Sequence, residues 1–288
     1  MSEMIAAMEL GGTKTVIALG DNRGRLIEEF RFPTTTPEET MAVALAWWRA
    51  RASFDRLGVG SFGPIRVDAT APDYGTFLTT PKLAWQGFSL IDYARAHLPG
   101  VHLFIDTDVQ AALLAEMTCG AARGMKDALY LTVGTGIGAG IASGGQLVHG
   151  TLHPEMGHLL VRRHPDDSFA GVCPYHHDCW EGLASGPAME QRWGVAAHNL
   201  PMDHPAWEME AFYLAQGLYT ACALFSPPCL ILGGGVSQAI GLHDKVARHL
   251  DAFANGYFES LGQRIVAPAL GQQAGIIGAL LLATKSYR

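Results

Sequence analysis

The stretch MIAAMELGGTKTVIAL, residues 4–19, points to the fold class of this chain. Residues 4–9 and 15–19 are short apolar runs that predict two β-strands, and the LGGTK sequence between them predicts a glycine turn, so the stretch should form a β-hairpin. A similar unit follows at residues 128–145, where ALYLTV and AGIASGG flank the turn GTGIG. The chain therefore shows a weak internal duplication of a strand–turn–strand unit.

Helices and strands alternate along the rest of the chain. A further strand is expected at residues 101–106, and residues 230–237 are expected to form a strand that runs into a glycine turn. Helices are expected at residues 38–53, 109–124, 211–227 and 274–287. Such an alternation is typical of an α/β fold.

The composition is that of a globular protein, because 49% of the 288 residues are hydrophobic and 16% are charged. A net charge of −7 argues against nucleic acid and anionic membranes as partners. We expect neither a transmembrane helix nor a signal peptide, since the chain has no apolar run of about 18 residues and its first residues lack a basic region. The five cysteines, an odd number, suit a reducing cytoplasm.

Both glycine turns are candidate phosphate-binding loops, because small residues let backbone N–H groups approach phosphate oxygens closely. The first turn offers Gly11, Gly12, Thr13, Lys14 and Thr15, and the second offers Gly134, Thr135, Gly136 and Gly138. Either turn alone could also be an ordinary hairpin turn. The sequence GTGIGA fits the dinucleotide-binding fingerprint too, but the glycines that follow it would break the helix that this fingerprint must open.

Two carboxylates, Asp106 and Asp108, stand where the predicted strand 101–106 meets the predicted helix 109–124. Ligands of α/β proteins bind at the carboxyl ends of strands. A carboxylate there can accept the proton of a substrate hydroxyl that attacks phosphorus. The alternative is that Asp108 is the N-cap of the helix.

The segment CPYHHDC, residues 173–179, has the spacing of a metal site. Its Cys-x₂-His-x₂-Cys pattern lets one loop place three ligands on a tetrahedral ion, and the distant His158 could close the set. Four protein ligands are typical of a structural zinc ion.

Two other interpretations of this segment remain. A redox pair is disfavoured, because five residues stand between the two cysteines instead of two. A loop without metal is the second alternative. Within a metal site, His176 is preferred to His177, since His177 lies only two residues from Cys179.

These motifs together resemble the ROK family of repressors, open reading frames and kinases. The matching stretches, in the family's order from residue 5 to residue 285, are ELGGTKT, TDVQAALLAE, LTVGTGIGAGI, HPEMGH, CPYHHDCWEGLASGPA, ILGGGVSQ and AGIIGALLLA. Glu9 stands where most members have Asp. Together with residues 75–90 and the histidine in the metal loop, it makes the chain most similar to the zinc-containing fructokinases of bacteria.

The resemblance implies an actin-like, hexokinase-like (ribonuclease H-like) α/β fold with two domains flanking an ATP cleft. Residues 1–110 would form the N-terminal domain, to which helix 274–288 returns. Residues 111–273 would form the larger C-terminal domain with the zinc loop.

The implied activity is ATP-dependent phosphorylation of D-fructose to fructose 6-phosphate, with Mg²⁺ and Zn²⁺, in a cytoplasmic homodimer. Kinases for mannose, glucose or an N-acetylhexosamine are the nearest alternatives. A sugar-responsive repressor would need an N-terminal helix-turn-helix extension, whereas the first strand is expected by residue 4. The presence of the base and of both phosphate turns argues against a sugar sensor without catalytic activity.

The resemblance also implies a role for each motif residue. Asp108 would be the general base, and the sugar would be contacted by Thr107, Glu155, His158 and Glu181. The ATP phosphates would face Gly11, Gly12, Thr13, Lys14, Gly134, Thr135 and Gly136, and the adenosine would face Gly233, Gly234 and Gly235. Zinc would be bound by His158, Cys173, His176 and Cys179. Thr107 and Gln110 replace two Asn residues of the family's Asn-Asp-x-Asn motif, which leaves the identity of the sugar open.

Overall fold

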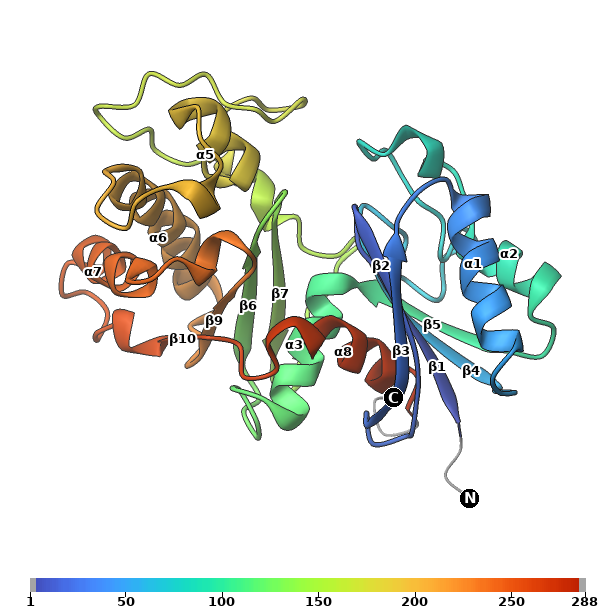
Figure 1. The fold of residues 1–288 in the computed structure, drawn as a ribbon. Helices are drawn as coiled ribbons and strands as arrows, with labels where there is room; N and C mark the ends of the chain where they lie inside the picture. Colours follow the sequence, from blue (N-terminus) through green and yellow to red (C-terminus); the bar gives the residue numbers. More distant parts are fainter. Residues whose placement is uncertain (1–3, 285–288) are drawn as a thin grey trace. The chain divides into compact units, whose positions relative to one another are not determined.

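A computed structural model describes residues 4–284 of the chain, which divide into two compact units (Figure 1). Unit 1 contains the chain as far as Thr118, the short segment His149–His153, and the chain from Leu270 onward. Unit 2 contains Cys119–Val148 and Pro154–Ala269. Each unit has one five-stranded sheet with helices beside it, so the predicted α/β class is confirmed.

The sheet of unit 1 has the strand order β3-β2-β1-β4-β5. Its strands are β1 (Ile5–Leu10), β2 (Lys14–Gly20), β3 (Leu26–Pro33), β4 (Arg56–Ser61) and β5 (His102–Thr107). The predicted hairpin is present, with Leu10 paired to Thr15 across the β1–β2 turn. Strand β4 runs parallel to β1, and β5 runs parallel to β4.

Helices cover both faces of this sheet (Figure 1). The helices of unit 1 are α1 (Pro37–Arg49), α2 (Leu90–His97), α3 (Asp108–Cys119) and α8 (Ala274–Leu282). Alternate residues of β1 point to opposite faces. Ala6 and Met8 pack in a core cluster that includes residues of α1, whereas Ile5 and Ala7 pack against α8.

The sheet of unit 2 has the order β10-β9-β6-β7-β8. Its strands are β6 (Ala128–Val133), β7 (Ile137–Ser143), β8 (Gln146–Leu147), β9 (Leu230–Gly233) and β10 (Ile265–Val266). Here too an antiparallel hairpin, β6–β7, is followed by a parallel strand, β9, beside its first strand. The two sheets thus share one strand order, which confirms the duplication expected from the glycine turns.

The longer helices of unit 2 pack around one apolar core. The helices are α4 (Trp180–Ala184), α5 (Gly186–Trp193), α6 (Ala206–Phe225) and α7 (Leu242–Ala254). Trp180, Tyr213 and Leu214 are fully buried in this core.

Several boundaries differ from those expected from the sequence. Helix α3 ends at Cys119 instead of residue 124, because a turn follows it. By contrast, strand β9 ends at Gly233 and runs into a glycine turn as expected, with a φ of +90° at Gly234. Helix α8 ends at Leu282, and residues 285–287 of the expected helix lie outside the described part of the chain.

The limit between the two units also differs from the expected position at residues 110 and 111. It falls between Thr118 and Cys119, because most of α3 belongs to unit 1. Ala115 of this helix is fully buried against Ile277 and Leu281 of α8.

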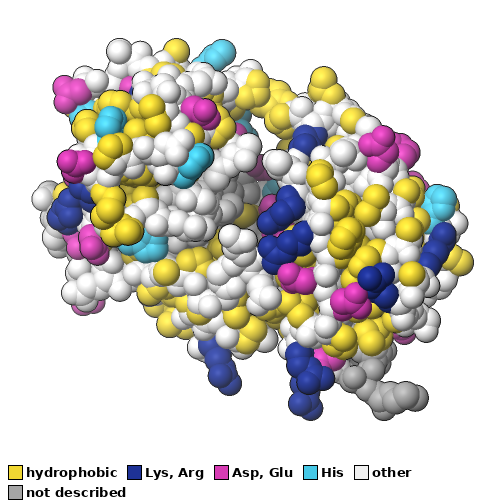
Figure 2. All heavy atoms as spheres, in the orientation of Figure 1, with side chains coloured by type: hydrophobic (Ala, Val, Ile, Leu, Met, Phe, Trp, Pro, Cys, Tyr) yellow, Lys and Arg dark blue, Asp and Glu magenta, His cyan; other side chains and the backbone are white. Residues whose placement is uncertain are grey.

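No helix among residues 4–284 is both long enough and apolar enough to cross a membrane. On the face drawn in Figure 2, basic side chains are mixed with acidic ones.

Candidate active site

The first glycine turn, between β1 and β2, is fastened to the sheet by Thr34. The hydroxyl of Thr34 donates to the Gly11 carbonyl at 2.7 Å, and its backbone N–H donates to the Thr13 carbonyl at 2.9 Å. Thr13 and Lys14 remain exposed at the tip. Thr15, by contrast, is fully buried and its hydroxyl bonds to that of Thr34 at 2.7 Å. The turn can therefore present Lys14 and backbone N–H groups to an anion, but not the Thr15 hydroxyl.

The second glycine turn, between β6 and β7, is held by residues of the next two helices. The Gly186 N–H at the start of α5 donates to the Gly134 carbonyl at 2.8 Å. Glu181 of α4 accepts a hydrogen bond of 2.9 Å from the Ile137 N–H. A Cβ atom on Gly136 would lie only 2.4 Å from Oε2 of Glu181, so a glycine is required for this approach. The structure thus brings a predicted sugar contact against a predicted phosphate turn.

The three glycines 233–235 lie close to this second turn. Gly233 is the last residue of β9 and pairs with Thr132 of β6, and Gly234 and Gly235 follow it, just as the second turn follows β6. Both glycine-rich segments therefore lie at the carboxyl ends of neighbouring parallel strands, where α/β proteins bind ligands. Gly234 has a left-handed backbone, and Gly235 has open space where a Cβ would stand.

Glu155 and His158 come from one short 3₁₀ turn of unit 2, Met156–His158, which begins directly after Glu155. The His158 N–H donates to the Glu155 carbonyl at 3.1 Å. Desolvation of its carboxyl, and then the negative charge of Glu181, raise the pKa of Glu155 to about 7, although the residue still reaches solvent. Two carboxylates thus lie near each other in unit 2, as a site for several sugar hydroxyls would need.

The four predicted zinc ligands form one cluster. The ligand atoms of His158, Cys173, His176 and Cys179 all lie within 4.8 Å of one another. His158 Nδ1 is 3.5 Å from the Cys179 sulfur and 3.8 Å from the Cys173 sulfur. Zn–S bonds near 2.3 Å and Zn–N bonds near 2.1 Å at tetrahedral angles put such atoms about 3.6 Å apart. The residues present therefore fit a zinc ion.

The loop that carries three of these ligands is a tight hairpin. Cys173 and His177 exchange two backbone hydrogen bonds, of 3.0 and 3.3 Å, and His177 has a left-handed φ of +55°. His177 is exposed and does not belong to the cluster. The loop continues from Cys179 into α4, whose first residue, Trp180, is fully buried. Helix α4 then brings Glu181 to the second glycine turn.

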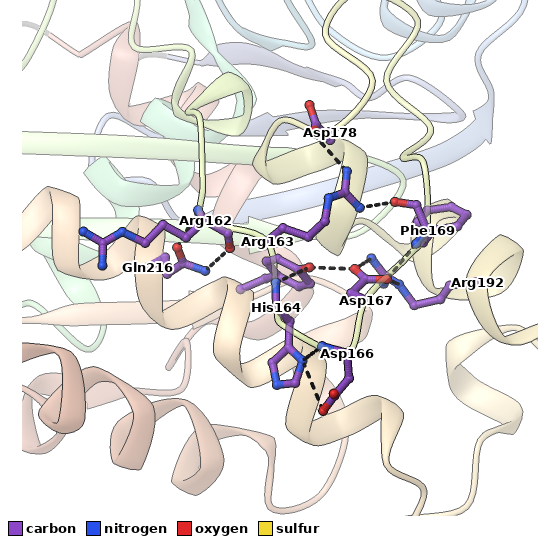
Figure 3. A network of polar contacts seen from close by, with 10 residues as sticks. Arg162, Arg163, His164, Asp166, Asp167, Phe169, Asp178, Arg192 and Gln216 are labelled. Carbon is purple, nitrogen blue, oxygen red and sulfur yellow. Dashed lines mark hydrogen bonds and ion pairs between the residues drawn. The ribbon is translucent and has the colours of Figure 1, made fainter.

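A polar network that the sequence did not reveal holds the segment between His158 and Cys173 (Figure 3). Asp167 accepts hydrogen bonds from Arg192 at 3.0 Å and from the Tyr213 hydroxyl at 2.6 Å. Burial opposes ionisation of Asp167, but these bonds and one from the Phe169 N–H hold its pKa below the ordinary value. Arg163 pairs with Asp178, the neighbour of Cys179, at 2.9 Å.

Asp108, in unit 1, is the first residue of α3 and is half-buried. The N-cap position belongs to Thr107, whose hydroxyl accepts from the Gln110 N–H at 3.2 Å. The side chain of Thr107, and not that of Asp108, therefore caps this helix. Oδ1 of Asp108 accepts a hydrogen bond of 2.9 Å from the Val109 N–H, which fixes one edge of this carboxylate.

Glu9, at the end of β1, lies against the start of α8. A Cβ on Gly275 would lie 2.5 Å from the Glu9 carboxyl carbon, and the Ile276 N–H donates to this carboxyl. Desolvation raises the pKa of Glu9, against the lowering effect of Lys14 and Arg31. Gln273, the residue before α8, makes no side-chain cap, so Glu9 takes the place of a helix cap.

Comparison with known proteins gives a consistent result. The family model described as "ROK family" matches residues 5–286. The fructokinase of Zymomonas mobilis is 41% identical over 98% of this chain and 96% of its own length, and that of Pediococcus pentosaceus is 39% identical over 99% of both chains. The crystal structure of a ROK hexokinase from Thermus thermophilus has a TM-score of 0.78, with 28% identity over 97% of both chains. This likeness confirms the expected hexokinase-like fold.

Proposed function

This chain belongs to the ROK family, and from that premise we propose that it is a sugar kinase that transfers the γ-phosphoryl group of ATP to the 6-hydroxyl of D-fructose. The assignment of fructose as the substrate rests on one observation: the chain is 41% and 39% identical to two fructokinases over nearly its whole length. A kinase for another hexose is the alternative.

Asp108 is the general base of this reaction. Its carboxylate stands at the carboxyl end of β5 and the start of α3, and it accepts the proton of the sugar hydroxyl as the oxygen attacks the γ-phosphorus. The neighbouring Thr107 hydroxyl accepts from Gln110 and keeps its own proton for the sugar.

The two glycine turns bind the phosphates of ATP. Lys14 supplies a positive charge at the first turn, and the backbone N–H groups of residues 12–13 and 135–136 approach the phosphate oxygens where no side chain intervenes, while the N–H groups of Gly11 and Gly134 close the turns themselves. Charge stabilisation of this kind, with correct positioning, accounts for most of the catalysis in phosphoryl transfer. Gly233, Gly234 and Gly235 bind the adenosine.

Glu155, His158 and Glu181 hold the sugar. Carboxylate oxygens accept hydrogen bonds from sugar hydroxyls, and the second ring nitrogen of His158 can donate to the sugar when Nδ1 faces the two sulfur atoms. Glu181 contacts the second phosphate turn through the Ile137 N–H. The same side chain thereby links the sugar to the phosphates.

His158, Cys173, His176 and Cys179 would hold Zn²⁺, which supplies a structural crosslink between the 3₁₀ turn of His158 and the loop that precedes α4. The four residues themselves orient the His158 ring and the start of α4, and so the Glu181 carboxylate. ATP enters as its Mg²⁺ complex. We further propose that the enzyme is a cytoplasmic homodimer.

A coupled assay of ADP production with fructose, mannose, glucose and N-acetylmannosamine tests this function. We expect the highest kcat/KM with fructose, and fructose 6-phosphate as the product. Faster turnover of another hexose would overturn the fructose assignment, and an absence of ADP with every sugar would overturn the kinase. Sedimentation of the purified protein tests the dimer.

A further inference from the structure

A short crossover segment, His149–His153, belongs to unit 1, although the chain on either side of it belongs to unit 2. Three hydrogen bonds attach this segment to unit 1. His149 bonds to Asp106, the Thr151 carbonyl accepts from Arg66 at 2.9 Å, and His153 accepts from the Ile65 N–H at 3.4 Å. The segment is therefore fixed at both ends and in the middle.

The bond at the first end is a two-oxygen contact. Nε2 of His149 lies 2.9 Å from Oδ2 of Asp106 and 3.1 Å from Oδ1. An ionised carboxylate only accepts hydrogen bonds, so Nε2 is the nitrogen that carries the proton. The Asp106 side chain is only 6% exposed, and that of His149 is 31% exposed. A carboxylate buried to this extent needs such a partner.

Asp106 in turn organises the turn between β5 and α3. Its Oδ1 accepts a hydrogen bond of 2.8 Å from the Thr107 N–H, and the Thr107 hydroxyl caps α3. Asp108 follows directly. The Asp106–Thr107 peptide unit, one residue before the proposed base, is thus oriented by a carboxylate that His149 holds in place, over a sequence separation of 43 residues.

We propose that His149 is a positioning residue for phosphoryl transfer, acting through Asp106 on the turn that carries Asp108. This inference rests on the proposed role of Asp108 as the general base. Without the ring, the Asp106 carboxylate rotates toward water and releases the Thr107 peptide. The Asp108 carboxylate then shifts relative to the sugar hydroxyl, and a shift of about 1 Å can reduce a rate by up to about 100-fold.

The test compares His149→Ala with His149→Gln. We expect the Ala variant to lose kcat by about 10-fold while its KM for ATP stays within about 2-fold, because the loss concerns a transition-state interaction and not ATP binding. The Gln side chain can offer an N–H near the position of Nε2, so it should restore most of kcat. Thermal unfolding of each variant checks that the fold persists.

The matched control is His153→Ala, which loosens the far end of the same segment but leaves the His149–Asp106 bond. Its kcat should stay near that of the wild type. Equal losses in the His153 and His149 variants, or a Gln variant no better than the Ala variant, would overturn the proposal.

A double variant separates this inference from the proposed function. In an Asp108→Asn background, His149→Ala should lower kcat little further, because both changes impair the same function, proton acceptance by Asp108. If His149→Ala lowers kcat in this background as much as it does in the wild type, His149 acts elsewhere. That result overturns this inference alone. An Asp108→Asn variant with the wild-type rate would overturn the base assignment, and the inference with it.

Discussion

Replacing Gly136 by alanine should damage fructose binding as well as ATP binding. The new Cβ would lie 2.4 Å from Oε2 of Glu181, whereas non-bonded heavy atoms approach to about 3.5 Å. The carboxylate must therefore move by about 1 Å, and its 2.9 Å hydrogen bond from the Ile137 N–H is lost. Hydrogen bonds to charged groups contribute about 1.5–3 kcal/mol, so the KM for fructose should rise by about 10- to 100-fold.

The assay is a fructose titration at saturating ATP, and an ATP titration at saturating fructose. Gly12→Ala in the first turn is the matched control, because its Cβ would meet only the flexible end of Lys82, at 3.4 Å. The control should leave the KM for fructose near the wild-type value. A Gly136→Ala enzyme with an unchanged KM for fructose would refute the contact between Glu181 and this turn as a part of the sugar site.

Three further predictions concern the metal loop, the base and acid stability. Cys179→Ser should lower the zinc content from about one ion per chain and raise the KM for fructose, whereas His177→Ala should do neither; metal analysis with fructose titration decides this. Asp108→Asn should bind fructose normally but lose at least about 100-fold in kcat, and a near wild-type rate would contradict its role as the base. Asp167 has a lowered pKa in the folded state, so its contribution to the free energy of unfolding is present above about pH 4 and is lost as the pH falls further. Urea unfolding between about pH 5 and 2 should therefore show a flatter acid dependence for Asp167→Asn than for the wild type, and parallel curves would contradict this.

The parts of the fold that the sequence predicted are those specified locally. Each hairpin is defined by a glycine turn between two apolar runs, and the Cys173–Cys179 spacing alone brings three metal ligands together. Helix α7 was missed, although Leu242, Val246, Leu250 and Ala254 recur at the helical interval and are buried. Strand β3 was missed because its charged residues obscure the alternation of a half-buried strand.

The contacts between distant residues could not be predicted, because no spacing signals them. Glu181 and Ile137 are 44 residues apart, and His149 and Asp106 are 43 residues apart. Each residue alone has an ordinary interpretation as a surface carboxylate or a loop histidine. Likewise, nothing in the local sequence shows that α3 is buried against α8, and this contact sets the limit of unit 1.

Unit 1 is built from both ends of the sequence, and this affects how it can fold during synthesis on the ribosome. Strand β1 emerges early, but helix α8, which covers its Ile5 and Ala7, begins only at Ala274. At about 5–20 residues per second, the gap lasts tens of seconds, and during it the apolar face of the nascent sheet stays open to chaperones. Only when Ile276 emerges can it donate its N–H to Glu9 beside the first phosphate turn. An interrupted translation product would therefore present an unfinished form of the proposed ATP site, and a nearly complete unit 2, to the degradation machinery.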